Sequence, residues 1–262
     1  MADILEIAGK KFRSRLMVGT GKYRTPEEMV AALEASGTEI VTVAIRRLNL
    51  DNPAEKTILD WVDWKKYTIL PNTAGCRTVE EALFVARLGR QVTASTWVKL
   101  EVIPEPSHLF PDPVGTFEAA KQLVKEGFTV LPYIHADPIL ARRLEEAGCA
   151  TVMPLGSAIG SGQGIRTQEE IQVIIEAARV PVVVDAGLGA PSDASLALEL
   201  GAEAVRVNTA IAQAKDAALM GTAFKQGVEA GRNAYLAGRI PKRAFAQPSS
   251  PVTDLPQVAG KR

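Results

Sequence analysis

Cysteine and histidine are scarce in this chain of 262 residues, which has two of each. Cys76 and Cys149 do not form a C-x-x-C pair, and neither His108 nor His135 lies in H-E-x-x-H or a comparable ligand pattern. Zinc sites need three or four protein ligands, and a disulfide framework needs several cysteines. We therefore expect reduced thiols, no dedicated metal site and no cofactor.

An excess of one charge is also missing, because 30 Lys and Arg residues balance 30 Asp and Glu residues. The basic residues are scattered along the chain, which argues against a nucleic-acid partner. No window reaches the ~18 consecutive apolar residues of a membrane span. The first 25 residues lack the apolar core of a signal peptide. We expect a cytoplasmic protein that does not enter a membrane.

A repeated joint organises the chain: a helical pattern stops at glycine and an apolar strand begins. Glycine at this position accepts the left-handed conformation that ends a helix. The joints are EASGTEIVTV (34–43), VKEGFTVLP (124–132), EEAGCATVMP (145–154) and LELGAEAVRV (198–207).

Apolar runs predict eight strands, each followed by a helical pattern such as TVEEALFVARL or TQEEIQVIIEAA. Eight such units in about 250 residues predict a single (β/α)8 TIM barrel of the α/β class. A doubly wound open sheet is the alternative, and the even spacing favours closure. The predicted strands are 15–19, 39–45, 67–71, 97–103, 129–134, 151–155, 181–185 and 204–208.

The two ends of the chain differ from these units. ADILEIAGKKF (2–12) alternates like a short hairpin that could cap the barrel floor. We expect a barrel domain over 1–240 and, over 241–262, an extended or flexible arm rich in Pro and Ser.

Two charged residues interrupt the apolar strand WVKLEVI (97–103). Alternation puts Lys99 and Glu101 on one face of this strand. They could point outward, or form an ion pair without chemistry. Alternatively, Lys99 lies inside the barrel, where burial favours a neutral amine that can attack a carbonyl, and Glu101 moves protons.

A second carboxylate and several glycine-rich loops are expected at the same end of the barrel. Asp185 ends a run of valines in VPVVVDAGLG, as a turn residue or as an acid and base beside Lys99. The loop with Gly187 and Gly189 and the NTA turn with Asn208 and Thr209 lie where barrels commonly hold a phosphate. The glycines of PLGSAIGSGQGI, after the sixth strand, are expected at the same end. The residues alone predict an imine-forming enzyme that acts on a phosphorylated sugar.

Six stretches, in order along nearly the whole chain, resemble the thiazole synthase family of bacterial thiamine biosynthesis. They are LPNTAGC (70–76), WVKLEVI (97–103), EEAGCATVMPLGSAIGSGQGI (145–165), VDAGLGAPSDA (184–194), VRVNTAIA (205–212) and VEAGRNAYLAGRIP (228–241).

The resemblance implies a thiazole phosphate built from 1-deoxy-D-xylulose 5-phosphate, dehydroglycine (2-iminoacetate) and the thiocarboxylate of a small sulfur carrier protein. It makes Lys99 the imine-forming residue, and Glu101 and Asp185 its acid and base pair. The positions that match the family's phosphate site are Gly160, Ala186, Gly187, Asn208 and Thr209. It also implies a homo-oligomer, a tetramer or a dimer, and a separate enzyme, an oxidase or a radical tyrosine lyase, that makes dehydroglycine.

Two residues near the expected site receive no role. LPYIHADP (131–138) departs from the Thr- and Asp-rich turn of the family, and we interpret His135 as a polar loop substitution. Cys76 invites a role as a sulfur relay, but free cysteine is more often a small buried hydrophobe. Two alternative functions are a class I aldolase that uses the same lysine and a non-catalytic barrel that binds a phosphosugar.

Overall fold

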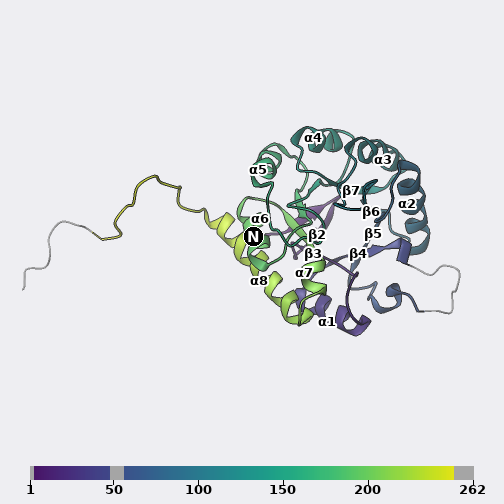
Figure 1. The fold of residues 1–262 in the computed structure, drawn as a ribbon, viewed down its shortest axis with the longest axis horizontal. Helices are drawn as coiled ribbons and strands as arrows, with labels where there is room; N and C mark the ends of the chain where they lie inside the picture. The colour runs from purple at the N-terminus through teal and green to yellow at the C-terminus, as the bar shows by residue number, and fades with distance from the viewer. Residues whose placement is uncertain (1–2, 48–55, 251–262) are drawn as a thin grey trace, which may run out of the picture.

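The protein is a closed barrel of eight parallel strands surrounded by helices (Figure 1). The computed structural model describes residues 3–47 and 56–250. The barrel strands are β3 (Leu16–Gly19), β4 (Ile40–Ala44), β5 (Thr68–Asn72), β6 (Trp97–Leu100), β7 (Thr129–Ile134), β8 (Met153–Pro154), β9 (Val183–Asp185) and β10 (Ala204–Val207).

The strand order shows that the sheet is a barrel and not an open doubly wound sheet. Neighbouring strands follow the order β8-β7-β6-β5-β4-β3-β10-β9, with β10 paired in parallel to both β3 and β9. Two parallel bridges, Val152 to Val182 and Leu155 to Asp185, connect the remaining edges. The structure therefore confirms the predicted (β/α)8 architecture.

The outer helices follow their strands as the sequence predicts, and several begin at a capping side chain. Thr25, Thr78, Asp112, Asp137 and Asp216 each accept a hydrogen bond from a backbone N–H in the first turn. The helices are α1 (Pro26–Ser36), α2 (Val79–Thr93), α3 (Pro113–Lys125), α4 (Pro138–Glu146), α5 (Gln168–Ala177), α6 (Pro191–Glu199), the short α7 (Thr209–Ala212) and α8 (Ala217–Ala237).

One connection differs from the expected repeat. Between β4 and β5 the described residues form the 3-10 turns η1 (Ile45–Arg47) and η2 (Ile58–Trp61) instead of an α-helix. Residues 48–55 of this connection lie outside the described ranges. The expectation that every strand is followed by a helix is thus wrong for the described part of this unit.

The barrel interior has two layers with different chemistry. The lower layer is apolar and includes Met17, Ile40, Leu70, Leu131, Met153, Val183 and Ala204. The hairpin of β1 (Leu5–Ile7) and β2 (Lys10–Phe12) packs Leu5, Ile7 and Phe12 against it and closes the floor, as predicted. Because side chains alternate along a strand, residues two positions later form the upper layer. That layer is polar, and it contains Thr42, Asn72, Lys99, Asp185 and Arg206.

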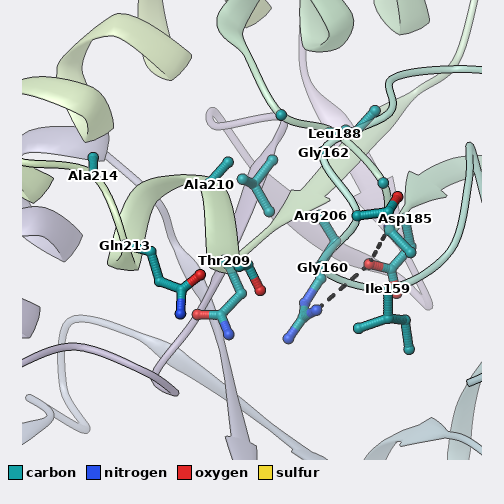
Figure 2. Close-up of a pocket in the computed structure, with 16 residues that line it drawn as sticks. Ile159, Gly160, Gly162, Asp185, Leu188, Arg206, Thr209, Ala210, Gln213 and Ala214 are labelled. Carbon is teal, nitrogen blue, oxygen red and sulfur yellow. Dashed lines mark hydrogen bonds and ion pairs between the residues drawn. The ribbon is translucent and has the colours of Figure 1, made fainter. Parts of the chain in front are cut away.

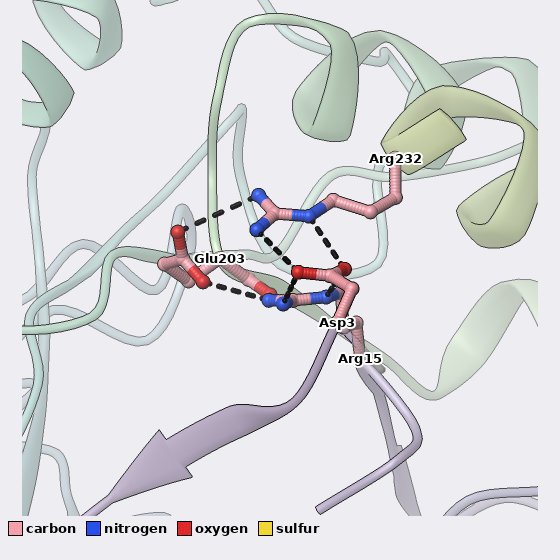
Figure 3. A network of polar contacts seen from close by, with 4 residues as sticks. All are labelled: Asp3, Arg15, Glu203 and Arg232. Carbon is pink, nitrogen blue, oxygen red and sulfur yellow. Dashed lines mark hydrogen bonds and ion pairs between the residues drawn. The ribbon is translucent and has the colours of Figure 1, made fainter. Parts of the chain in front are cut away.

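A group of charged side chains fixes the N-terminal segment to the barrel floor (Figure 3). Asp3 accepts hydrogen bonds from Arg15 and Arg232, and both arginines also pair with Glu203. The hydrogen bond from Arg232, together with Arg15, lowers the pKa of Asp3 to about 2. Arg15 is 5% exposed, so its charge is buried but fully partnered.

The chain leaves the barrel after α8, which packs between α1 and α6 (Figure 1). Residues 238–250 contain no helix or strand and are exposed along their length. Within the described residues, no helix is both long enough and apolar enough to span a membrane.

Candidate functional site

Lys99 lies inside the barrel and ends between two carboxylates. Its amine contacts a carboxylate oxygen of Glu101 and lies 2.8 Å from Oδ2 of Asp185. The side chains of Lys99 and Asp185 are each 1% exposed, and that of Glu101 is 6% exposed. The two residues that the strand pattern placed on one face therefore meet a third, which comes from β9, three strands further round the barrel. Buried ionic groups at this density cost free energy of folding unless they are paired, which marks the cluster as a candidate site.

Asp185 ends β9 and is held from several directions. Oδ1 accepts a hydrogen bond of 2.8 Å from the N–H of Ala186 and lies 3.5 Å from Nη1 of Arg206. Burial alone would raise the pKa of Asp185, but the positive charges of Lys99 and Arg206 outweigh it and hold the pKa below its ordinary value. Asp185 is therefore an ionised carboxylate at neutral pH.

Glu101 follows β6 directly, and the neighbouring strand positions its backbone. The Thr73 hydroxyl donates to the Glu101 carbonyl over 2.8 Å and accepts from its N–H over 2.7 Å. The Tyr133 ring centroid lies 4.9 Å from the Lys99 amine. Burial, and then the charges of Asp185 and Glu101, raise the pKa of Tyr133, so it remains a neutral phenol beside the amine.

Arg206 is a charged residue of this layer that the sequence analysis did not select. It lies on β10, between the buried residues Val205 and Val207, with 14% of its side chain exposed. Nη2 donates to Oγ1 of Thr42 on β4 over 3.0 Å. A lone arginine alternating with valines is the same signal that identified Lys99, so it could have been found from the sequence.

Two cavities open above the charged layer and share Ile159, Arg206, Asn208 and Thr209. One, of about 250 Å³, contains Asp185 and the glycine-rich loops (Figure 2). The other, of about 230 Å³, contains Glu101, Asn72 and Lys22. Because Arg206 borders both, a ligand that spans the cavities passes its guanidinium group.

The predicted phosphate positions meet at the rim of the first cavity. Gly160, Ala186, Gly187, Asn208 and Thr209 all line it. Their groups are not equally available, since the N–H of Ala186 donates to Asp185. In the orientation that satisfies its hydrogen bonds, the Asn208 side-chain amide nitrogen faces two backbone carbonyls. It donates to the carbonyls of Gly19 (3.1 Å) and Gly21 (3.0 Å). Asn208 thus holds the loop after β3.

That loop carries Lys22, a second cation absent from the sequence predictions. A Cβ atom placed on Gly160 would lie 3.5 Å from the Lys22 amine and 3.7 Å from Oγ1 of Thr209. Lys22 therefore brings a positive charge to the glycine loop. The backbone φ of Lys22 is 71°. Because Lys22 lies in a loop, no periodic sequence pattern predicts where its side chain points.

Replacing Gly187 with alanine is expected to destabilise the fold by more than about 2 kcal/mol and to displace the Asp185 loop. Gly187 has a φ of 78°, and an added Cβ would lie 1.9 Å from Oγ of Ser157. Gly127 is the matched control, with a φ of 79° and nothing within 4 Å of its Cβ position. G127A should lose only about 1 kcal/mol in urea unfolding. Equal losses in the two variants would contradict the close approach at Ser157.

His135 and Cys76 lie near the site without joining the charged cluster. The His135 ring packs 4.8 Å from the ring of Phe110, and burial lowers its pKa, which favours the neutral imidazole. Burial raises the pKa of Cys76 to about 11, so this residue stays a thiol and is a poor nucleophile. Across the described ranges, no three His, Cys, Asp or Glu side chains are placed to hold a metal ion.

Comparisons with known proteins agree along nearly the whole chain. The family model of thiazole biosynthesis protein ThiG matches residues 6–251. A thiazole synthase of Synechococcus sp. is 60% identical over 260 residues, 97% of this chain and 94% of that protein. A bifunctional protein ThiO/ThiG of Nostoc sp. is 59% identical over 255 residues, covering 95% of this chain but 39% of that longer protein. The crystal structure of the Amycolatopsis orientalis BexX/CysO complex contains a chain that is 35% identical, with a TM-score of 0.82 and coverage of 92% of this chain and 98% of that one.

Proposed function

The chain belongs to the ThiG family of thiazole synthases in thiamine biosynthesis, and we propose that it forms the thiazole phosphate through an imine on Lys99. The proposed substrates are 1-deoxy-D-xylulose 5-phosphate, dehydroglycine (2-iminoacetate) and the thiocarboxylate of a sulfur carrier protein. The observation that carries the proposal is the buried Lys99 amine between Glu101 and Asp185, beneath the two cavities.

The first step is attack of the Lys99 amine on the ketone of the sugar phosphate. An ammonium group cannot attack, so Lys99 must first pass a proton to a neighbouring carboxylate, and Glu101 is in contact with it. Loss of water then leaves an iminium ion. We propose that Asp185 compensates the positive charge of this iminium ion. The positive charges of Lys99 and Arg206 lower the pKa of Asp185, so it is already ionised when the reaction begins.

The iminium ion acidifies the adjacent C–H bond, so a carboxylate can remove that proton and the carbonyl character moves to the next carbon. The sulfur of the carrier thiocarboxylate adds to that carbonyl carbon, and the acyl group then moves from sulfur to the former carbonyl oxygen. The carrier leaves as its carboxylate and takes that oxygen with it, so the sulfur stays on the sugar skeleton. Addition of dehydroglycine, attack of its nitrogen on the carbon bound to Lys99 with release of the Lys99 amine, and loss of water complete the thiazole, with proton transfers by Glu101 and Asp185.

The phosphate of the sugar occupies the rim of the first cavity in this proposal. Gly160, Gly187 and Thr209 line the place, and Lys22 supplies a positive charge beside Gly160. Ala186 and Asn208 shape it, the first by holding Asp185 and the second by holding the loop of Lys22. In this placement the carbon chain of the sugar extends from the rim to Lys99.

The proposed partner is a small sulfur carrier protein whose extended C-terminal tail enters the cavity. The 35% identical chain was crystallised as a BexX/CysO complex, so a barrel of this kind accepts a second protein. We further propose a cytoplasmic homo-oligomer, a dimer or a tetramer, and a separate enzyme that makes dehydroglycine, either an oxidase or a radical tyrosine lyase. Residues 1–240 form the catalytic unit in this proposal; of the predicted arm 241–262, residues 251–262 lie outside the described ranges.

Reconstitution tests the proposed substrates. The purified chain is mixed with 1-deoxy-D-xylulose 5-phosphate, the carrier thiocarboxylate, and glyoxylate with ammonium, which condense to the imine. We expect a thiazole phosphate by mass spectrometry, with sulfur from labelled carrier, and no product when any one component is omitted. Cleavage of the sugar phosphate without a sulfur donor would instead indicate an aldolase.

A further inference from the structure

We propose that Arg206 binds the carboxylate of the second small substrate, an α-imino acid, and so places its imine beside the sugar carbon chain held on Lys99. The inference rests on the proposed function and adds to it a binding group for the nitrogen donor.

Arg206 has the right place for this role. It projects from β10 into the first cavity (Figure 2). It also borders the second cavity. One carboxylate separates it from the reacting amine, because Asp185 lies 2.8 Å from the Lys99 amine through Oδ2 and 3.5 Å from Arg206 through Oδ1. An anion on Arg206 is therefore close to the Lys99 adduct.

The guanidinium group also has hydrogen-bonding capacity to spare. An arginine side chain offers five N–H donors. In the described structure one of them makes a hydrogen bond, to Thr42, while Asp185 is at ion-pair distance and Nε is buried without a partner. Lys99, by contrast, is already in contact with two carboxylates. A bidentate carboxylate is the ligand that an arginine fork fits best.

The neighbouring strand leaves space for this arginine. An alanine Cβ at Gly19 of β3 would lie 2.7 Å from Nη2 of Arg206 and 2.9 Å from the Asn208 side chain. The glycine thus allows the guanidinium group to pass β3 and reach Thr42 on β4.

A carboxylate fits Arg206 better than the sugar phosphate does. The phosphate positions gather at the loop rim, around Gly160, Gly187 and Thr209, with Lys22 as their cation. Arg206 lies deeper, on the strand itself and against Asp185. The small second substrate carries one negative charge, on its carboxylate, and no phosphate. Arg206, the deeper cation, is therefore available to bind that carboxylate.

Oxamate tests the inference, because it has the carboxylate of the imino acid and an unreactive amide in place of the imine. Its binding to the chain preloaded with the sugar phosphate is measured by calorimetry, with uncharged oxamide as the comparison. We expect R206Q to bind oxamate about 10- to 100-fold more weakly, since a charge-assisted hydrogen bond is lost. R206K should recover part of the loss. The exposed control R179Q should show no loss and should bind oxamate as the unsubstituted chain does.

Trapping of the sugar adduct with borohydride separates the possible failures. No adduct in the unsubstituted chain contradicts the proposed function itself. An adduct with unchanged oxamate binding in R206Q contradicts only the carboxylate site and leaves Arg206 as a partner of Asp185. A larger effect of R206Q on half-saturation by the sugar phosphate than on oxamate binding would assign Arg206 to the phosphate instead.

Discussion

Lys99→Arg is expected to lower the rate of thiazole formation by at least about a thousandfold, the scale seen when a catalytic nucleophile is removed. Arginine keeps the positive charge that Glu101 and Asp185 surround, but its guanidinium does not lose a proton and cannot attack the ketone. The measurement is the rate of thiazole phosphate formation at saturating substrates.

Lys121→Arg is the matched control, since Lys121 is exposed on α3 and its amine lies over the Phe117 ring. It should retain the full rate. Thermal unfolding of K99R tests whether the barrel still folds with the larger side chain. A folded K99R with more than about a tenth of the original rate would show that Lys99 is not the nucleophile.

Asp185→Asn is expected to reduce the rate by about 10²- to 10⁴-fold, the range for loss of a general acid or base. The same change removes a charged partner of the buried Lys99 and of the partly buried Arg206, so it should also lower the free energy of unfolding by about 3 kcal/mol. Urea unfolding and steady-state rates measure the two effects separately. The exposed Glu118 on α3 provides the control E118Q, for which neither quantity should change.

The stability difference between D185N and the unsubstituted chain should depend on pH. Lys99 and Arg206 hold the pKa of Asp185 below its ordinary value of about 4, so its charge stabilises the folded state fully above that pH. The difference should shrink as the pH falls from about 4 toward the folded-state pKa. A difference that grows on acidification would contradict the assignment of Asp185 as an ionised partner.

Much of the barrel was predictable because its signals are local and repeated. Glycine joints mark the helix ends, and alternation along WVKLEVI placed Lys99 and Glu101 on one face, which the structure shows to be the interior one. The connection after β4 escaped prediction because its described ends form 3-10 turns, which lack the periodicity of an α-helix.

The candidate site was predictable where a strand points a charge inward, and less so where loops decide. Lys99, Glu101 and Asp185 meet as the barrel model requires. Their assigned roles remain predictions. Two contacts depend on loop conformations with positive φ that no sequence pattern predicts. One is the hydrogen bond from the Ala186 N–H to Asp185, and the other is the approach of Lys22 to Gly160.

The most direct test of the central claim is to trap the imine. The chain is incubated with 1-deoxy-D-xylulose 5-phosphate alone, reduced with borohydride, digested and analysed by mass spectrometry. The account predicts an adduct of the dehydrated sugar phosphate on Lys99, absent from K99R. No adduct, or an adduct on Lys22 or another lysine, would contradict it and leave Lys99 as a buried ion-pair partner.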